Sequence, residues 1–286
     1  MNKIVLTRDY VKEILPTRPK NSNKGTFGKV LNIAGCENYK GAAWLSSVSA
    51  LKVGAGLVTL ASEEKVVNNL FMPPVTTISL DGNSGTKDFA ELTPVIYGYD
   101  VISTGSGVRE DEYFKDLLFE VLNLCKTVQK PTVIDAGALN IIAREKYPKL
   151  FETAIITPHP KEASRLLDEN VEDICKNREY SVQKLRDKFG CTAVLKGEKT
   201  LIAGLNGVLY ENTTGNSALA KAGSGDVLTG MISGFCAQTK NTVKSACLGV
   251  FMHGQTGDEA CLEMTEYCVN SDDLIKFIPK AFKTIL

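Results

Sequence analysis

The chain has 286 residues, 43% of them hydrophobic, which suits a water-soluble α/β protein with a sizeable core. Its 33 basic and 33 acidic residues balance, so no strong overall field favours nucleic acid or an anionic membrane as a partner. The chain shows no signal-like or membrane-spanning apolar run, and its eight cysteines form no CxxC pair, so we expect a cytoplasmic protein with reduced, mostly buried thiols.

The first half of the chain alternates short apolar runs with longer amphipathic stretches. Strands are predicted at residues 30–34, 57–61, 101–104, 132–135 and 154–157. Helices are predicted at residues 42–53 and 110–125. This alternation predicts an α/β fold with a mostly parallel central sheet and helices on both faces.

The second half begins with short strands separated by glycine-containing turns, a pattern typical of antiparallel pairing. These strands are predicted at residues 193–196, 200–203 and 207–211. Two apolar-faced helices follow, at residues 226–235 and 242–257. Four glycines are expected to let these two helices approach closely: Gly230, Gly234, Gly249 and Gly254. We interpret residues 81–86 as a surface loop and residues 1–286 as one domain.

The strongest local signal is the glycine-rich segment 212–230, NTTGNSALAKAGSGDVLTG. Gly223, Ser224 and Gly225 stand where an apolar helix begins, so their backbone N–H groups and the helix dipole predict an anion hole suited to phosphate. Taken alone, Asp226 would most simply cap that helix. A carboxylate repels phosphate and is therefore a poor binding partner, so its presence here suggests a chemical role. Asp226 is thus also a candidate base for a hydroxyl that attacks a phosphoryl group.

Seven motifs in order along the chain carry a family resemblance. They are GTFGKVLNIAG (25–35), GAA (41–43), VIDAGAL (133–139), TPHPKE (157–162), VLKGEKT (194–200), TGNSALAKAGSG (214–225) and AGSGDVLTG (222–230). Together they resemble the ADP-dependent NAD(P)H-hydrate dehydratases of the ribokinase-like superfamily, over residues 24–277. The pattern begins early in the chain, so we expect the stand-alone form, working with a separate NAD(P)H-hydrate epimerase.

The resemblance implies an activity and a set of site residues. The expected reaction is ADP-dependent dehydration of the S form of NADH hydrate and NADPH hydrate to NADH and NADPH, giving AMP and phosphate. Mg²⁺ is expected as a cofactor, ATP is a possible replacement for ADP, and relatives of this kind form homotetramers. The resemblance assigns to the nucleotide Lys196, Gly197, Glu198, Lys199, Thr200 and Gly225. It assigns to the hydrated dinucleotide Ala43, Gly107, His159 and Asp226.

Two positions depart from the family pattern. Ser224 stands where the family often has threonine, a change that keeps a hydroxyl group. Ser106, between Gly105 and Gly107, stands where the family often has proline, and it loosens the turn that leads to Gly107.

Several single residues have both a structural and a functional interpretation. A lone loop histidine such as His159 is more often structural, but its place just after a predicted parallel strand favours a ligand site. Lys196 is either an exposed turn residue or a cation near the nucleotide phosphates. Asp135 could bind Mg²⁺ or cap the next helix, and we expect the cap. His253 is expected to pack against its neighbours on a helix.

Two other functions remain open from the sequence. A small-molecule kinase of the same fold is one alternative, and the motifs around His159 and at residues 25–35 count against it. A non-catalytic adenine-nucleotide sensor is the other, and the intact Asp226 counts against it, because a pure binder gains nothing from a carboxylate beside phosphate.

Overall fold

Most strands of this protein are continuous runs of apolar or small residues. In β5 (Val101–Thr104) and β8 (Thr192–Leu195) every residue is buried, which is typical of parallel sheets covered on both faces. The remaining strands are β1 (Lys3–Val5), β2 (Lys29–Ile33), β3 (Leu57–Glu63), β4 (Thr76–Leu80), β6 (Thr132–Ile134), β7 (Ala154–Ile156), β9 (Leu201–Ala203) and β10 (Leu209–Glu211). The computed structural model describes residues 2–72 and 74–286.

All ten strands join one sheet in the order β1-β10-β9-β8-β7-β6-β5-β2-β3-β4. Only β9 runs against the other strands: it is antiparallel to both β8 and β10. The edge strand β1 pairs in parallel with β10, and in this register Lys3 lies opposite Leu209. The predicted mostly parallel sheet, with antiparallel pairing after residue 193, is therefore confirmed.

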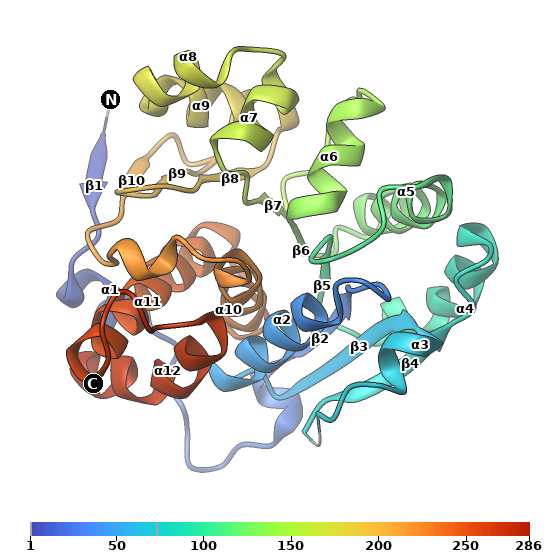
Figure 1. The fold of residues 1–286 in the computed structure, drawn as a ribbon, viewed down its shortest axis with the longest axis horizontal. Helices are drawn as coiled ribbons and strands as arrows, with labels where there is room; N and C mark the ends of the chain where they lie inside the picture. Colours follow the sequence, from blue (N-terminus) through green and yellow to red (C-terminus); the bar gives the residue numbers. More distant parts are fainter. Residues whose placement is uncertain (1, 73) are drawn as a thin grey trace.

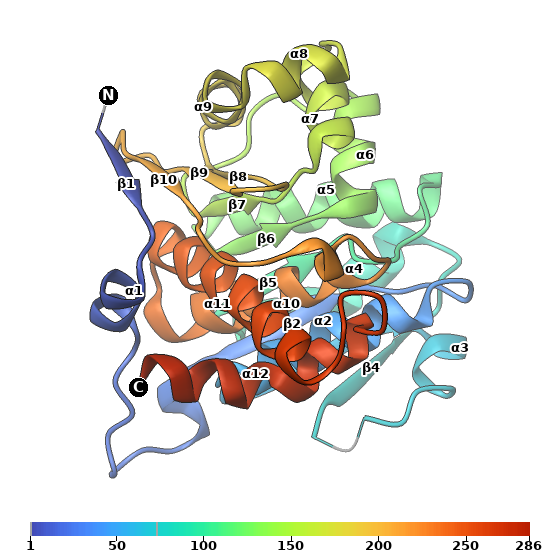
Figure 2. The same cartoon turned by 60° about the vertical axis from the view of Figure 1, so that its left-hand side comes forward.

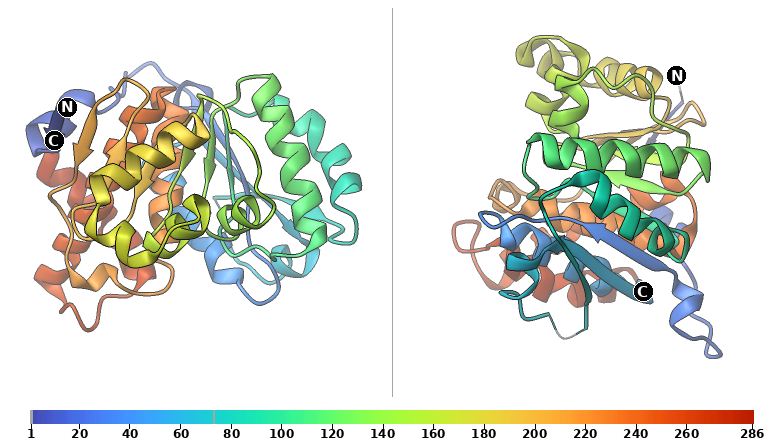
Figure 3. Two further views of the ribbon diagram at one scale, coloured as in Figure 1. Left: turned by 90° about the horizontal axis from the view of Figure 1, so that it is seen from above. Right: turned by 90° about the vertical axis from the view of Figure 1, so that its right-hand side faces the viewer.

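Helices cover both faces of the sheet, as Figures 1 and 2 show. One face carries α1 (Arg8–Ile14), α2 (Lys40–Lys52), α10 (Ser224–Thr239), α11 (Thr242–Glu263) and α12 (Ser271–Ile285). The other face carries α4 (Gly85–Tyr97), α5 (Glu112–Thr127), α6 (Ala136–Arg144), α7 (Pro160–Leu167), α8 (Val171–Lys176) and α9 (Arg178–Phe189). Three short elements complete the fold: α3 (Glu64–Val67) and the 3₁₀ helices η1 (Lys24–Phe27) and η2 (Ser217–Leu219). The two views of Figure 3 show the sheet between these two layers.

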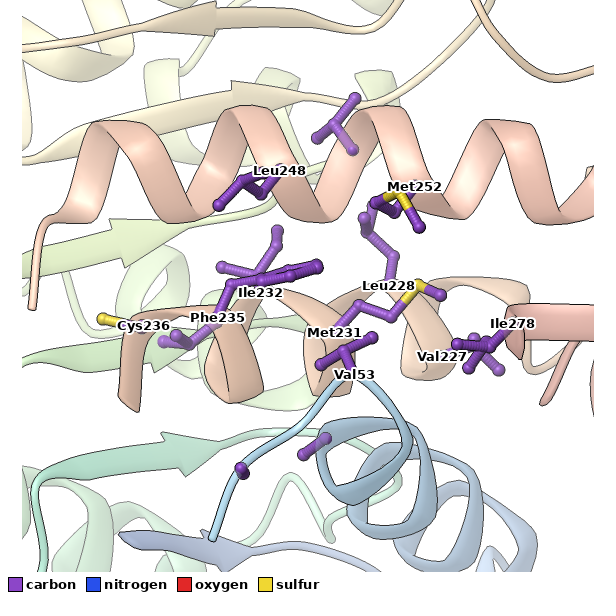
Figure 4. Close-up of a cluster of buried hydrophobic side chains, with 14 of the residues drawn as sticks. Val53, Val227, Leu228, Met231, Ile232, Phe235, Cys236, Leu248, Met252 and Ile278 are labelled. Atoms are coloured by element: carbon purple, nitrogen blue, oxygen red, sulfur yellow. The ribbon is translucent and has the colours of Figure 1, made fainter. Parts of the chain in front are cut away.

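The two helical layers enclose two hydrophobic cores, and alternate residues of each strand supply them. Val30 of β2 faces the α2–α10–α11 core, while its neighbour Leu31 faces the α5–α9 core. Figure 4 shows part of the first core, where Ile232 of α10 lies near Leu248 of α11 and Met231 lies near Val53 at the end of α2. Helix α10 is therefore packed between α2 and α11.

The expectation that four glycines join the two C-terminal helices is only partly right. A side chain on Gly249 of α11 would collide with Ile232 of α10, as predicted. Gly230 and Gly234 instead face α2, where a Cβ would collide with the backbone carbonyls of Ser46 and Ala50. Gly254 faces Thr214, which belongs to the glycine-rich segment. The prediction was wrong at these three positions because their partners, helix α2 for Gly230 and Gly234 and Thr214 for Gly254, lie in distant parts of the sequence.

Other predictions have mixed outcomes. The 81–86 loop is shorter than expected, because Ser84 accepts a hydrogen bond from the Lys87 amide and starts α4 at Gly85. All eight cysteines are free and five of them are buried, as predicted. Among the described residues we find no helix with the length and apolar character needed to cross a bilayer.

The strand order contains one reversal, and this positions the candidate site. Strands β2 and β5 are neighbours in the middle of the sheet. Strands β6, β7 and β8 follow in order on the β5 side, and β3 and β4 follow in order on the β2 side. At such a reversal the loops after the two central strands leave on opposite sides and open a crevice at the carboxyl ends. The loops after β2 and β5 begin at Ala34 and Gly105.

The close contact between α10 and α2 yields a stability prediction. Gly230→Ala should lower the free energy of unfolding by about 1–3 kcal/mol, because the added methyl group must displace α2. Gly41→Ala is the matched control: no described atom lies within 4 Å of a Cβ there, so the change should be neutral or stabilise by up to about 1 kcal/mol. Urea unfolding of both variants measures the effects, and equal stabilities would contradict the proposed packing.

Candidate functional site

A buried ion cluster lies at the carboxyl ends of β6, β7 and β8. Lys196 follows β8, and its Nζ lies 2.7 Å from Asp135 Oδ1 and 3.7 Å from Glu162 Oε2. The Asp135 carboxylate also accepts hydrogen bonds from the hydroxyls of Thr157 and Thr229, both at 2.8 Å. Three segments distant in sequence thus converge on one lysine.

The charges in this cluster shift one another's pKa values. Burial opposes the charged form of Asp135, but Lys196 and the two hydroxyls outweigh it and lower the pKa of this carboxyl. The pKa of Lys196 is raised, because Asp135 and Glu162 outweigh the effect of burial. For Glu162, burial dominates and raises the pKa. The expectation that Asp135 caps the next helix is wrong: it occupies the N-cap position of α6, but its side chain makes no cap hydrogen bond.

The glycine-rich segment starts α10 beside this cluster. Gly223 is the N-cap residue with φ 86°, a conformation that favours glycine. The N–H groups of Gly225 and Asp226 have no acceptor within the described chain. A Cβ on Gly225 would lie 3.6 Å from Lys196 Nζ, so the free amides and the lysine ammonium face one small space. The geometry suits an anionic ligand.

Asp226 lies in the first turn of α10 but does not cap the helix, because Gly223 holds the cap position. Burial and the Asp135 carboxylate raise the pKa of Asp226 to about 6, against the opposing effects of Ser106 and Lys196. The Ser106 hydroxyl, which departs from the family pattern, is buried beside Asp226 and makes no regular hydrogen bond within the described residues. A carboxylate with this pKa can accept a proton near neutral pH.

His253 has a role that the sequence did not indicate. It is buried on α11, as expected, but its Nε2 lies 3.1 Å from the Ser224 hydroxyl in the anion-hole segment. Burial lowers its pKa to about 4, so the ring is neutral at physiological pH. The contact was missed because a histidine spaced 29 residues from its partner leaves no local pattern.

Ala43 and Gly107 lie together at the reversal of strand order. Gly107 has φ 65°, and a Cβ on it would lie 2.6 Å from the Cβ of Ala42 at the start of α2. Gly35 packs against Ala43 in the same way, and its amide donates to the Ser106 carbonyl at 2.8 Å. Through Ser106, this side of the crevice adjoins Asp226.

His159 has the structural role that the sequence offered as one of its two interpretations. It is the N-cap of α7, where its Nδ1 accepts hydrogen bonds from the amides of Lys161 (3.1 Å) and Glu162 (3.2 Å). Accepting at Nδ1 leaves the proton of the neutral ring on Nε2. Burial and Lys196 lower the pKa of His159, while 47% of its side chain stays exposed and its Nε2 lies 3.5 Å from Glu162 Oε1.

The remaining residues predicted to bind the nucleotide lie in the turn after β8, and their side chains point in different directions. Lys196 points into the ion cluster, whereas Gly197 is exposed and Thr200 closes the turn by donating to the Gly197 carbonyl at 3.0 Å. The side chains of Glu198 and Lys199 line an open surface hollow of about 690 Å³ with Arg178 of α9. The structure therefore brings Lys196, Gly225 and Asp226 together and leaves these two side chains outside that group.

Within the described residues, no three His, Cys, Asp or Glu side chains form a ready-made metal site. The three carboxylates that act on Lys196, those of Asp135, Glu162 and Asp226, are nevertheless hard oxygen donors. A cation bound here would need phosphate oxygens of a ligand as well as these carboxylate oxygens to complete its coordination.

Sequence comparisons support a specific family. A family profile described as NAD(P)H-hydrate dehydratase matches residues 30–280. A bifunctional NAD(P)H-hydrate repair enzyme of Moorella thermoacetica is 35% identical over 99% of this chain, which spans only 54% of that relative. An ADP-dependent (S)-NAD(P)H-hydrate dehydratase of Bacillus subtilis is 33% identical, with 99% of both chains covered.

Solved structures agree in fold. A Bacillus subtilis ADP/ATP-dependent NAD(P)H-hydrate dehydratase, co-crystallised with ATP and Mg²⁺, matches with a TM-score of 0.87 and 29% identity over the whole of both chains. A ribokinase-like superfamily protein of Enterococcus faecalis matches with a TM-score of 0.88 and 30% identity, over 99% of this chain and 96% of the other. The predicted ribokinase-like fold is confirmed.

The environment of Asp226 yields a prediction about stability and pH. A carboxyl whose pKa is raised on folding favours folding most below its unfolded value near 3.8, and this contribution is lost as the pH rises through about 6. Asp226→Asn removes the buried charge, so its stability relative to the native chain should rise across this window, by at most about 3 kcal/mol at pH 8. Urea unfolding at pH 4, 6 and 8 tests this, and a difference independent of pH would contradict the raised pKa.

Proposed function

This chain belongs to the NAD(P)H-hydrate dehydratase family, and we propose that it catalyses ADP-dependent dehydration of the S form of NADH hydrate and NADPH hydrate. The products would be NADH or NADPH, AMP and phosphate. One observation carries the proposal: a carboxylate with a pKa of about 6 stands beside free helix amides and a buried lysine, next to the crevice at the reversal of strand order.

The proposal places the adenine nucleotide at the α10 side of the crevice. Its phosphates would meet the amides of Gly223, Gly225 and Asp226, with Lys196 supplying positive charge. The Ser224 amide, which the sequence also assigned to the anion hole, instead donates to the Lys221 carbonyl at 3.3 Å. Residues 197–200 would contact the nucleotide mainly through backbone groups, because the side chains of Glu198 and Lys199 face elsewhere. ADP is the expected nucleotide, and ATP is a possible substitute.

The hydrated dinucleotide would occupy the other side, near Ala43, Gly107 and His159, with its ring hydroxyl toward Asp226. Asp226 accepts the proton of that hydroxyl while its oxygen attacks the terminal phosphorus of ADP. The bond from this phosphorus to the bridging oxygen breaks, and AMP leaves. The α10 amides stabilise the charge on the transferred phosphoryl group.

The second half of the reaction expels phosphate. Hydroxide is a poor leaving group and phosphate is a good one, so the phosphorylated ring loses phosphate as the ring-nitrogen lone pair moves toward the carbon. Loss of a ring proton then restores NADH or NADPH. This chemistry explains why a kinase-like site serves a dehydration.

Mg²⁺ fits the proposal. When bound with the nucleotide it would offset the phosphate charge. The carboxylates of Asp135, Glu162 and Asp226 offer the oxygen donors that it prefers, and a relative was co-crystallised with ATP and Mg²⁺.

The alternatives differ in what happens to the nucleotide. A small-molecule kinase would use the same base, and a hydroxyethylthiazole kinase shares the fold at 14% identity. That likeness reaches the fold alone, whereas the family match covers residues 30–280. A nucleotide sensor has no use for a proton-accepting carboxylate in the anion site.

We further propose that residues 1–286 form one domain, that the protein acts as a homotetramer in the cytoplasm, and that a separate epimerase supplies the S form. The single ten-stranded sheet supports the first point. Bifunctional relatives, whose length exceeds this chain, are consistent with a partner activity.

The direct test follows the return of reduced-nicotinamide absorbance. The protein is incubated with NADH hydrate and Mg²⁺, with ADP, with ATP or with neither. Recovery that depends on nucleotide, with AMP formed from ADP, is expected. Nucleotide consumption only with another alcohol would indicate a kinase, and binding without turnover would indicate a sensor.

Asp226→Asn should lower kcat by a factor of about 10² to 10⁴, the usual contribution of a general base. Binding of ADP should hold or tighten, since a negative charge is removed. In the native protein kcat/KM should fall below about pH 6, because the base must be deprotonated. Asp272→Asn, which removes an exposed carboxylate from the first turn of α12, is the control with unchanged kcat. A near-normal kcat for Asp226→Asn would exclude this residue as the base.

His159→Asn separates the two roles of the histidine. Asparagine is a good N-cap residue, so the melting temperature should hold, whereas His159→Ala should cost about 1 kcal/mol of stability. If the exposed face of the ring contacts the dinucleotide, the Asn variant should raise KM for NADH hydrate about tenfold with unchanged affinity for ADP. Normal kinetics in both variants would leave His159 with the cap alone.

A further inference from the structure

Arg178 reaches from the first turn of α9 to the turn that follows β8. One guanidinium nitrogen, Nη2, donates to the carbonyls of Leu195 at 3.2 Å and Lys196 at 3.5 Å. The other, Nη1, donates to the carbonyl of Glu198. Gly197 packs directly on the guanidinium group, since a Cβ there would lie 2.9 Å from Nη2. One side chain thus binds three carbonyls of a single turn.

These hydrogen bonds fix the direction of the peptide groups in the turn. The carbonyls of Leu195, Lys196 and Glu198 point toward α9, and the amides of Gly197, Glu198 and Lys199 have no acceptor within the described chain. Gly197 has φ 145° and Lys199 has φ 50°. Successive free amides in such a turn form a concave group of donors that suits an anion.

The position of Arg178 is electrostatically unfavourable, which argues against a merely structural role. A cation at a helix N-terminus opposes the helix dipole, and Arg178 forms no ion pair with a carboxylate among the described residues. Its guanidinium is half-buried, and its Nε is buried without a hydrogen-bond partner. Among the described residues, the turn after β8 alone accepts hydrogen bonds from Arg178, so the role of Arg178 is tied to the function of that turn.

We propose that Arg178 is a positioning residue for the nucleotide phosphates: by binding the carbonyls of Leu195, Lys196 and Glu198, it holds the amides of residues 197–199 free to bind the phosphates. This inference rests on the proposed nucleotide site and extends it. The residue touches no nucleotide itself and acts through the backbone. Its loss should therefore weaken nucleotide binding while the base at Asp226 keeps its surroundings.

The test measures ADP affinity by calorimetry and repair kinetics with NADH hydrate. Arg178→Met keeps the length of the apolar stem and removes the donors. The dissociation constant and KM for ADP should rise about 10- to 100-fold, whereas kcat at saturating ADP and KM for NADH hydrate should stay within about threefold. An unchanged ADP affinity in a folded Arg178→Met variant would overturn the proposal.

Arg144→Met is the matched control. Arg144 is also a helical arginine that donates to a backbone carbonyl, that of Glu110, but it lies on α6, away from the turn. Its loss should leave ADP affinity unchanged. An equal loss of ADP affinity in both variants would show a general effect of arginine removal and overturn the specific role.

Two further measurements test the proposal if Arg178→Met folds poorly. Arg178→Lys keeps the charge but cannot span three carbonyls, so ADP affinity should fall by an intermediate factor. Adding guanidinium ion at millimolar concentration to Arg178→Ala should restore part of that affinity. Full affinity in the Lys variant would overturn the proposal. A native chain that binds ADP but repairs no NADH hydrate would refute the proposed function and leave the role of Arg178 standing.

Discussion

The site depends on the buried ion pair between Lys196 and Asp135. The pair joins the ends of β6 and β8, while Thr229 ties it to α10 and Glu162 ties it to α7. Because a buried charge left without its partner is strongly destabilising, any rearrangement that separates these segments is opposed. The position of the α10 amides relative to the strand ends is therefore fixed before a ligand arrives, which is the condition for electrostatic stabilisation without reorganisation.

The same pair also sets the chemistry of its neighbour. The Lys196 ammonium group attracts three carboxylates and lies nearest to Asp135. The other two carboxyl groups, those of Glu162 and Asp226, have raised pKa values. A phosphate entering this space would draw on the same lysine and make Asp226 still more basic. In the proposed reaction, nucleotide binding and proton acceptance would thus be coupled through a single cation, and Asp226 would become a stronger base once the nucleotide is bound.

The sequence predicted what depends on local pattern and missed what depends on contacts across the fold. Strands such as β7 (Ala154–Ile156) were found because they are continuous apolar runs. The roles of Gly230 and Asp135 were misassigned because their partners, α2 and Lys196, lie in distant parts of the chain. The structure places Lys196, Gly225 and Asp226, which the motifs assigned to the site, close together, while the contact of every site residue with a ligand stays a prediction. His253 and Arg178 carry no motif, and only coordinates could reveal their partners.

The pairing of β1 with β10 has a consequence for synthesis on the ribosome. These strands are separated by roughly 200 residues, so at about 5–20 residues per second the first strand waits some tens of seconds for its neighbour. During that time β1 is an unpaired edge in a nascent chain. Its brevity and the charged Lys3 make it a poor template for unwanted strand pairing. The N-terminal segment can therefore stay unpaired without aggregating, and the sheet is completed only after β10 has emerged from the ribosome.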